Sequence, residues 1–95
     1  MSEKATEWEI ERGLGTEGRL RIMRTLIKKP DEVFTKYQLE RLVYLKPIAV
    51  RKNLNVLTEI GWVQELPYQP RKYKVNMDKE TVRHLANFFE KTGYI

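Results

Sequence analysis

The stretch from Lys46 to Val75 reads KPIAVRKNLNVLTEIGWVQELPYQPRKYKV. Its first half predicts a helix that opens at Pro47, because proline lacks the N–H group that would stay unpaired in a first helical turn. Apolar residues recur at helical spacing up to Gly61, where the helix is expected to end. The inner face of this helix would consist of Val50, Leu54, Leu57 and Ile60.

The second half of the stretch predicts a β-hairpin. Residues 62–66 alternate like a half-buried strand, and the proline-flanked residues 67–70 are typical of a turn. Residues 71–75 would return as a second strand, with Tyr73 and Val75 on one face and two lysines on the other. A basic helix followed by a basic hairpin is therefore expected.

Two helices are predicted before this stretch. The first runs from about Thr16, a fair N-cap, to Lys29, and Pro30 stops it. Its buried face would consist of Leu20, Met23, Leu26 and Ile27. After a short extended segment at 32–35, Thr35 and Gln38 have the spacing of a capping box. The inner face of this second helix would consist of Leu39, Leu42 and Val43, and Tyr44-Leu45 would form the turn that follows.

The two ends of the chain complete the expected order α-β-α-α-β-β-α. Residues 4–12 predict an additional short amphipathic helix with Trp8 and Ile10 as its apolar members. Asp78 is expected to cap a last helix, whose stripe would consist of Val82, Leu85, Ala86 and Phe89. The fold class is α+β and mostly helical. Residues 1–95 form one domain, with 1–13 as an N-terminal helical extension and 78–95 as a C-terminal helix.

Three segments resemble the small ArsR/MarR-like winged-helix regulators of archaea and bacteria. LGTEGRLRIMRTLIKKP looks like the opening helix of that family, AVRKNLNVLTEIGWV like its recognition helix, and RKYKVN like the return strand of its wing. The resemblance spans residues 14–82 and implies a winged helix-turn-helix fold. It also implies a dimeric transcription regulator that binds double-stranded DNA. Metal-sensing members use Cys and His ligands, so that activity does not carry over to a chain with no cysteine and one histidine.

The charge distribution favours a polyanionic partner. The chain carries a net charge of +5, with positive clusters in residues 19–29, 46–53 and 67–76, while residues 1–18 hold two basic and five acidic side chains. Hydrophobic content of 41% indicates a folded core, and no apolar run reaches the roughly 20 residues of a membrane span. A cytoplasmic location is the expectation, and a charged fraction of 33% suits a thermophile.

The outward residues of the helix and the hairpin are the candidate DNA-binding residues. Arginine can bridge guanine O6 and N7, asparagine can pair with adenine, and an aliphatic tip can touch a thymine methyl group. Wing residues would contact the flanking minor groove or backbone. Two further residues at the start of the preceding helix would add phosphate contacts. The full set is Lys36, Tyr37, Lys46, Ile48, Arg51, Lys52, Asn55, Tyr68, Gln69, Arg71 and Lys72.

Other functions remain open from the sequence. One alternative is that the polar faces are only solvated surface, and another is a protein-interaction module that uses Ile48, Val56 or Tyr68. Single-stranded nucleic acid binding through the wing tyrosines is a third alternative. No enzyme, metal site, cofactor or small-molecule effector is expected, because His84 is the lone histidine and the Glu7, Glu9, Glu11 series reads as a solvated face.

The aromatic residues of the termini predict a homodimer. Phe88, Phe89 and Tyr94 at one end, and Trp8 and Ile10 at the other, exceed what one small domain readily buries. The alternative is that both terminal helices pack on their own domain.

Arg19, Arg21 and Arg24 of the helix predicted at 16–29 share no narrow face. Some of them should therefore pair with the acidic N-terminal segment instead of binding nucleic acid.

Overall fold

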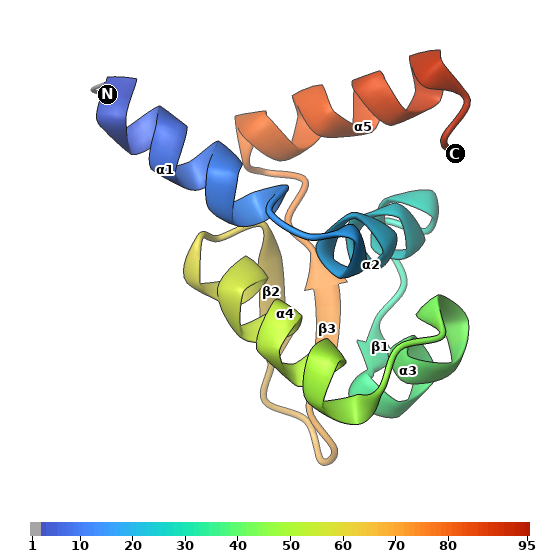
Figure 1. The fold of residues 1–95 in the computed structure, drawn as a ribbon. Helices are drawn as coiled ribbons and strands as arrows, with labels where there is room; N and C mark the ends of the chain where they lie inside the picture. Colours follow the sequence, from blue (N-terminus) through green and yellow to red (C-terminus); the bar gives the residue numbers. More distant parts are fainter. Residues whose placement is uncertain (1–2) are drawn as a thin grey trace.

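The computed structural model describes residues 3–95, with side chains from residue 7 onward. The described residues form five helices and a small sheet in the predicted order, and Figure 1 shows their arrangement. The elements are α1 (Glu3–Gly13), α2 (Glu17–Lys28), β1 (Phe34–Thr35), α3 (Lys36–Val43), α4 (Pro47–Glu59), β2 (Val63–Leu66), β3 (Lys72–Val75) and α5 (Glu80–Thr92). The predicted α+β class and element order are therefore confirmed.

Helices α2, α3 and α4 pack around the core, and their apolar patterns predict most of the buried residues. The inner face of α4 is buried at all four predicted positions, and Gly61 follows the helix with a φ of +81°. Thr16 caps α2, and the Thr35–Gln38 capping box opens α3 with both of its hydrogen bonds. In α2 the core side chains are Ile22, Met23, Leu26 and Ile27, while Leu20 is only half-buried.

One predicted core residue of α3 is exposed. Leu39 and Val43 lie one turn apart and face the core, so the short helix is oriented around those two positions. Leu42 therefore points away from the core and is 52% exposed. The prediction of Leu42 as a core residue is wrong.

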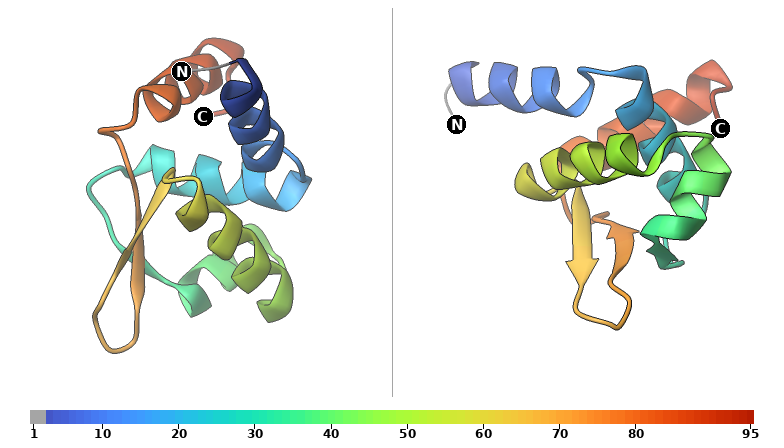
Figure 2. Two further views of the ribbon diagram at one scale, coloured as in Figure 1. Left: turned by 90° about the vertical axis from the view of Figure 1, so that its left-hand side faces the viewer. Right: turned by 60° about the horizontal axis from the view of Figure 1, so that its bottom comes forward.

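The three strands form one antiparallel sheet in the order β1-β3-β2. Glu65 pairs with Tyr73 and Leu66 with Lys72, which fixes the register of the hairpin. Figure 2 shows this hairpin extending beyond the helices, at the end opposite α1 and α5. The arrangement leaves the hairpin tip free to contact a partner.

The buried side of α1 differs from the predicted one. Trp8 and Ile10 are exposed, whereas Glu9 is only 8% exposed and accepts a hydrogen bond from Trp62 Nε1 at 2.7 Å. The Nζ of Lys79 lies 3.8 Å from the same carboxylate. Gly13 lies against the Trp62 ring, with room for no Cβ. A buried acceptor for the indole N–H, rather than apolar contact alone, orients α1.

The last helix corrects the predicted cap and confirms that Val82, Leu85 and Phe89 of the predicted stripe are buried. Asp78 does not cap α5, because Asn76 Oδ1 accepts its backbone N–H and the helix begins two residues later with Lys79 at the N-cap. Phe89 is buried in the domain core, and Tyr94 packs against its edge with a centroid distance of 4.8 Å. Only Phe88 of the three C-terminal aromatic residues remains exposed, at 60%.

None of the helices in the described part of the chain has the length and the apolar character that a membrane span requires.

Candidate nucleic-acid interface

The start of α3, the outer face of α4 and the hairpin meet around a hollow of about 380 Å³. Six of the eleven predicted DNA-binding residues line it, namely Lys36, Tyr37, Arg51, Asn55, Gln69 and Arg71. Pro70, Tyr73 and Glu65 complete the lining. The remaining predicted residues, Lys46, Ile48, Lys52, Tyr68 and Lys72, lie outside the hollow, on α4 and its N-cap and on the hairpin.

The capping box positions the contribution of α3. Thr35 ends β1 and caps the helix, so the two residues that follow it occupy the first helical turn. Lys36 Nζ lies 5.6 Å from the centroid of the exposed Tyr37 ring. A cation beside the positive end of the helix dipole favours an anion at this end of α3.

The outer face of α4 presents two hydrogen-bonding side chains one turn apart. Arg51 and Asn55 are exposed and both line the hollow, because the inner positions of the helix are fixed in the core. Lys52 is exposed beside them, and the exposed Ile48 extends the surface toward the N-terminus of the helix. This set combines bidentate donors and acceptors with an aliphatic tip, which suits base edges in a major groove.

The hairpin contains a carboxylate that the sequence reading missed. Glu65 Oε1 accepts a hydrogen bond from Tyr73 Oη at 3.1 Å and lies 3.3 Å from Arg71 Nη1. Partial burial raises the pKa of Tyr73, and the hydrogen bond to Glu65 raises it further. Glu65 thus positions Arg71 at the hollow. It also places one negative charge among the three basic side chains of the lining, Lys36, Arg51 and Arg71. The sequence could have indicated this role of Glu65, because antiparallel pairing of the two predicted strands sets residue 65 opposite residue 73.

The tip of the hairpin carries the other wing residues. Lys72 Nζ lies 5.5 Å from the centroid of the exposed Tyr68 ring, which holds the ammonium group beside an aromatic face. The Gln69-Pro70 peptide bond is cis. The tip therefore presents a cation and an aromatic ring together, both outside the hollow.

We expect Glu65→Gln to strengthen binding to random duplex DNA. The change removes the only carboxylate in the hollow and frees Arg71, so affinity should rise two- to fivefold, which corresponds to about 0.5–1 kcal/mol for a solvent-screened charge. Fluorescence anisotropy at fixed salt measures this. Glu90→Gln, the same charge change on the exposed surface of α5, is the control. Equal gains from both variants would show that only net charge matters.

Other singled-out residues have structural or surface positions. Arg21 pairs with Glu17, as expected for arginines near the acidic segment, and Arg19 donates to the buried Asn53 at 2.9 Å. Asn53 was not identified from the sequence, although it joins the N-terminus of α2 to α4.

The single histidine, His84, is exposed, and its Nε2 lies 3.4 Å from Glu80 Oε1. The described residues include no group of three or more side chains suited to a metal ion.

Solved structures share this fold over nearly the whole chain. The transcriptional repressor BigR from Xylella fastidiosa is 19% identical, with a TM-score of 0.73 over 97% of this chain and 96% of that one. HlyU from Vibrio cholerae is 17% identical, with a TM-score of 0.76 over 97% of both chains. A possible transcriptional regulator from Methanosarcina mazei is 19% identical, with a TM-score of 0.64 over 94% of this chain and 79% of that one.

Sequence comparisons give no closer assignment. No protein-family model and no curated protein matches this chain. At these identities the structural likeness establishes the fold, and the predicted winged-helix architecture is confirmed.

Proposed function

We propose that this chain is a sequence-specific double-stranded DNA-binding protein that acts as a dimeric transcription regulator. The observation that carries the proposal is the hollow shared by α3, α4 and the hairpin, where residues far apart in the sequence present cations and amide groups on one surface. Such a surface matches the charge and hydrogen-bonding pattern of duplex DNA. The likeness to a transcriptional repressor and to a possible transcriptional regulator supports the same reading.

The proposed contacts divide into base reading and backbone positioning. Residues 46–60 enter the major groove, where Arg51 and Asn55 read base edges and Ile48 touches a thymine methyl group. Residues 67–72 hold the flanking minor groove or backbone, with Arg71 as the central contact. The positioning contacts to phosphate and sugar come from Lys36, Tyr37, Lys46, Lys52, Tyr68, Gln69 and Lys72.

The proposed dimer uses the end of the molecule that carries α1 and α5, away from the hairpin (Figure 1). Exposed Trp8, Ile10 and Phe88 lie on these helices. Phe88 also lines a hollow of about 420 Å³ together with Leu20, Phe89, Thr92, Gly93 and Tyr94. A two-fold dimer through this end would bind a pseudo-palindrome with half-sites about one helical turn, roughly 34 Å, apart.

Sedimentation equilibrium at tens of micromolar protein tests the dimer. We expect a mass near twice the 11.4 kDa of one chain. Phe88→Ser should shift the population toward monomer, since it removes exposed apolar area from the proposed interface. Tyr37→Ser, which removes an exposed ring from the DNA-facing end, should leave the mass unchanged. A monomeric wild-type protein would overturn the dimer proposal.

A protein-interaction role is the second candidate, and two exposed apolar side chains favour it. Ile48 and Tyr68 are each 54% exposed on the same end of the molecule, whereas Val56 is half-buried and less available. The salt dependence of binding to random duplex DNA distinguishes the DNA-binding role from the protein-interaction role. A DNA-binding surface must lose affinity for random duplex steeply as salt rises, because binding releases counterions. An interaction module has no such requirement.

Selection of bound fragments from random duplex DNA is the direct test of the proposed function. We expect an enriched sequence with two-fold symmetry, because each protomer would read one half-site. Recovery of fragments with no enriched sequence would restrict the function to nonspecific binding. Failure to bind duplex at low salt would exclude DNA binding by this domain.

A further inference from the structure

A polar junction joins α1 and α2 to the buried side of α4. The residue of α4 in this junction is Asn53, which is 9% exposed and shares the inner side of the helix with apolar residues. Its Oδ1 accepts hydrogen bonds from Arg19 Nε at 2.9 Å and from Thr16 Oγ1 at 3.2 Å. Both donors belong to the N-cap and first turn of α2, so the amide oxygen fixes the start of α2 against α4.

The two donors also hold the ends of their own helices. Thr16 Oγ1 accepts the backbone N–H of Arg19, so the hydroxyl group that caps α2 donates its own proton to Asn53. Arg19 Nη1 donates to the backbone oxygen of Arg12, in the last turn of α1. The last carbonyl groups of a helix lack partners within it, and the guanidinium supplies one. Arg19 thereby connects the end of α1 to α4.

A second connection runs from the side chain of Arg12 to α4. Its Nη2 lies 2.8 Å from Oε2 of Glu59, the last residue of α4. The same guanidinium lies 5.1 Å from the centroid of the ring of Trp8, which is exposed on α1. The two attachment points, at Asn53 and Glu59, are roughly 9 Å apart along the axis of α4. Two points fix the direction of α4 relative to α1 as well as its position.

Gly18 lets α2 approach this junction closely. A Cβ at position 18 would lie 2.7 Å from Asn53 Nδ2 and 3.1 Å from Leu45 Cδ1. Contacts this short displace one of the two groups, because protein interiors are closely packed. Any larger residue would therefore push α4, and the turn before it, away from α2.

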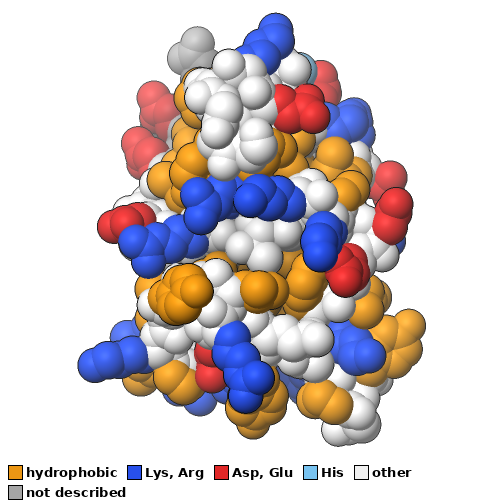
Figure 3. Space-filling view, turned by 90° about the vertical axis from the view of Figure 1, so that its right-hand side faces the viewer, with side chains coloured by type: hydrophobic (Ala, Val, Ile, Leu, Met, Phe, Trp, Pro, Cys, Tyr) orange, Lys and Arg blue, Asp and Glu red, His pale blue; other side chains and the backbone are white. Residues whose placement is uncertain are grey.

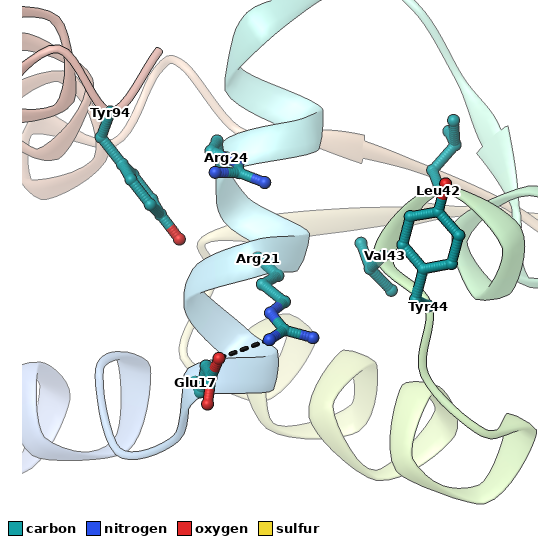
Figure 4. A pocket seen from close by; sticks show the side chains of 7 residues that line it. All are labelled: Glu17, Arg21, Arg24, Leu42, Val43, Tyr44 and Tyr94. Carbon is teal, nitrogen blue, oxygen red and sulfur yellow. Dashed lines mark hydrogen bonds and ion pairs between the residues drawn. The ribbon is translucent and has the colours of Figure 1, made fainter.

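Arg19 differs from the other arginines of α2. Lys and Arg side chains form a band across one face of the molecular surface (Figure 3). In Figure 4, Arg21 pairs with Glu17, and Arg24 lies near Tyr94 with its guanidinium 4.7 Å from the ring centroid. Arg19 instead bonds to polar groups of two other helices. A half-buried guanidinium with two defined acceptors orients the groups that it joins.

We infer that Arg19 and Asn53 are positioning residues, which fix α4 relative to α1 and thereby set the half-site spacing that the proposed dimer reads. This role rests on the proposed function, in which the end with α1 and α5 forms the dimer and α4 enters the major groove. Neither side chain lines the hollow of the interface, so both act through the placement of α4.

The physical basis of this role is the directionality of hydrogen bonds. Apolar core contacts are not directional and tolerate small slides or rotations of a helix, whereas bonds to a buried amide select one arrangement. One base pair corresponds to a shift of about 3.4 Å and a rotation of roughly 34° along duplex DNA. A small displacement of α4 relative to the dimer end therefore changes which half-site spacing fits.

Competition between duplexes that differ in half-site spacing tests this role. The duplexes carry the selected sequence, the same half-sites moved by one base pair in either direction, or a single half-site. The wild-type protein should prefer the selected spacing by at least about tenfold. Asn53→Leu and Arg19→Met should each reduce this preference to less than about threefold and change affinity for a single half-site less than about twofold.

Two further variants separate positioning from stability. Asn53→Asp should keep the wild-type spacing preference, because a carboxylate offers acceptors to the same two donors. Ile27→Ala lies about two turns farther along α2 than Arg19, in the core, so it should lower the urea midpoint and leave the spacing preference unchanged. Unchanged preference in both Asn53→Leu and Arg19→Met, or an equal loss in Ile27→Ala, would overturn the positioning role.

A measurement without DNA distinguishes failure of this role from failure of the proposed function. The chain has no cysteine, so spin labels can be attached to a double variant with Glu11→Cys on α1 and Lys52→Cys on α4. Double electron–electron resonance, with labelled chains diluted in unlabelled protein, gives the distance between the two labels within one chain. We expect one narrow distribution, which Asn53→Leu broadens or shifts and Ile27→Ala does not. An unchanged distribution in Asn53→Leu would overturn the positioning role, whereas wild-type protein that binds no pair of half-sites would contradict the proposed function.

Discussion

Replacing Trp62 with phenylalanine is expected to lower the free energy of unfolding by about 3 kcal/mol, whereas the same change at Trp8 should alter it by less than about 0.5 kcal/mol. Trp62 is fully buried at the junction of α4 and the hairpin, and Trp8 is 48% exposed on α1. The two tryptophans of the chain therefore form a matched pair. They differ in burial and in hydrogen bonding.

Two losses add up at Trp62. Phenylalanine is smaller than tryptophan, so the ring that fills the space beside Gly13 would leave a cavity. The variant also removes the indole N–H that donates to Glu9, and a hydrogen bond to a buried charged group contributes roughly 1.5–3 kcal/mol. The Nζ of Lys79, 3.8 Å from that carboxylate, would then be left to compensate its charge. A loss of this size is a large part of the stability of a small domain.

Urea unfolding followed by circular dichroism measures both variants. The midpoint should fall markedly for Trp62→Phe with a similar slope, and stay near wild type for Trp8→Phe. Glu9→Ala should reproduce part of the loss, since it leaves the buried indole N–H without an acceptor. Glu7→Ala and Glu11→Ala, on the exposed side of the same helix, should not. If all three glutamate variants behave alike, the buried role of Glu9 is wrong.

Replacing Arg51 with alanine is expected to reduce affinity for the selected DNA sequence about tenfold to hundredfold for each half-site, which corresponds to roughly 1–3 kcal/mol. Arg51 is exposed beside Asn55 on the outer face of α4, so its substitution should leave the fold intact. The main loss should be base discrimination, because a bidentate arginine contact distinguishes guanine from the other bases. Affinity for random duplex should fall much less.

Two further variants define what Arg51 contributes. Arg41→Ala removes the same charge from an exposed position on α3 outside the hollow, so it should have little effect on the selected sequence. Lys72→Ala should weaken selected and random DNA alike and lower the salt slope by about one, as expected for the loss of one phosphate contact. Fluorescence anisotropy at several salt concentrations measures all three. Equal losses for Arg51→Ala and Arg41→Ala would contradict a base-reading role for α4.

Much of the fold was predictable because its signals are local. Pro47 and Gly61 bound α4, and the Thr35–Gln38 capping box begins α3, since each acts through backbone atoms a few residues away. The inner face of α4 follows from helical spacing, and fixing that face also sets Arg51 and Asn55 outward. The sequence thereby determined the element order and the outer surface of α4.

The candidate interface was predictable only in part. Six predicted residues surround one hollow, because the hairpin and α3 meet α4 on a single side. Glu65 belongs to the same hollow but was overlooked, since its importance depends on pairing with Tyr73 across the hairpin. Lys72 lies outside the hollow although Arg71 and Tyr73 line it, because successive residues of a strand face opposite sides.

Only the tertiary structure determines which of several similar residues is buried. Glu7, Glu9 and Glu11 recur in one short segment, yet only Glu9 is buried, because Trp62 lies beneath that side of α1 and supplies an N–H donor. Leu42 fits the apolar pattern of α3 as well as Leu39 does, but it lies beside Arg24 at the edge of a hollow. Local pattern determined which residues form helices, strands and caps, since those interactions span a few residues. The burial of Glu9 depends on Trp62, 53 positions away, and the interface hollow depends on α3, α4 and the hairpin meeting, so only the packed fold brings these partners together.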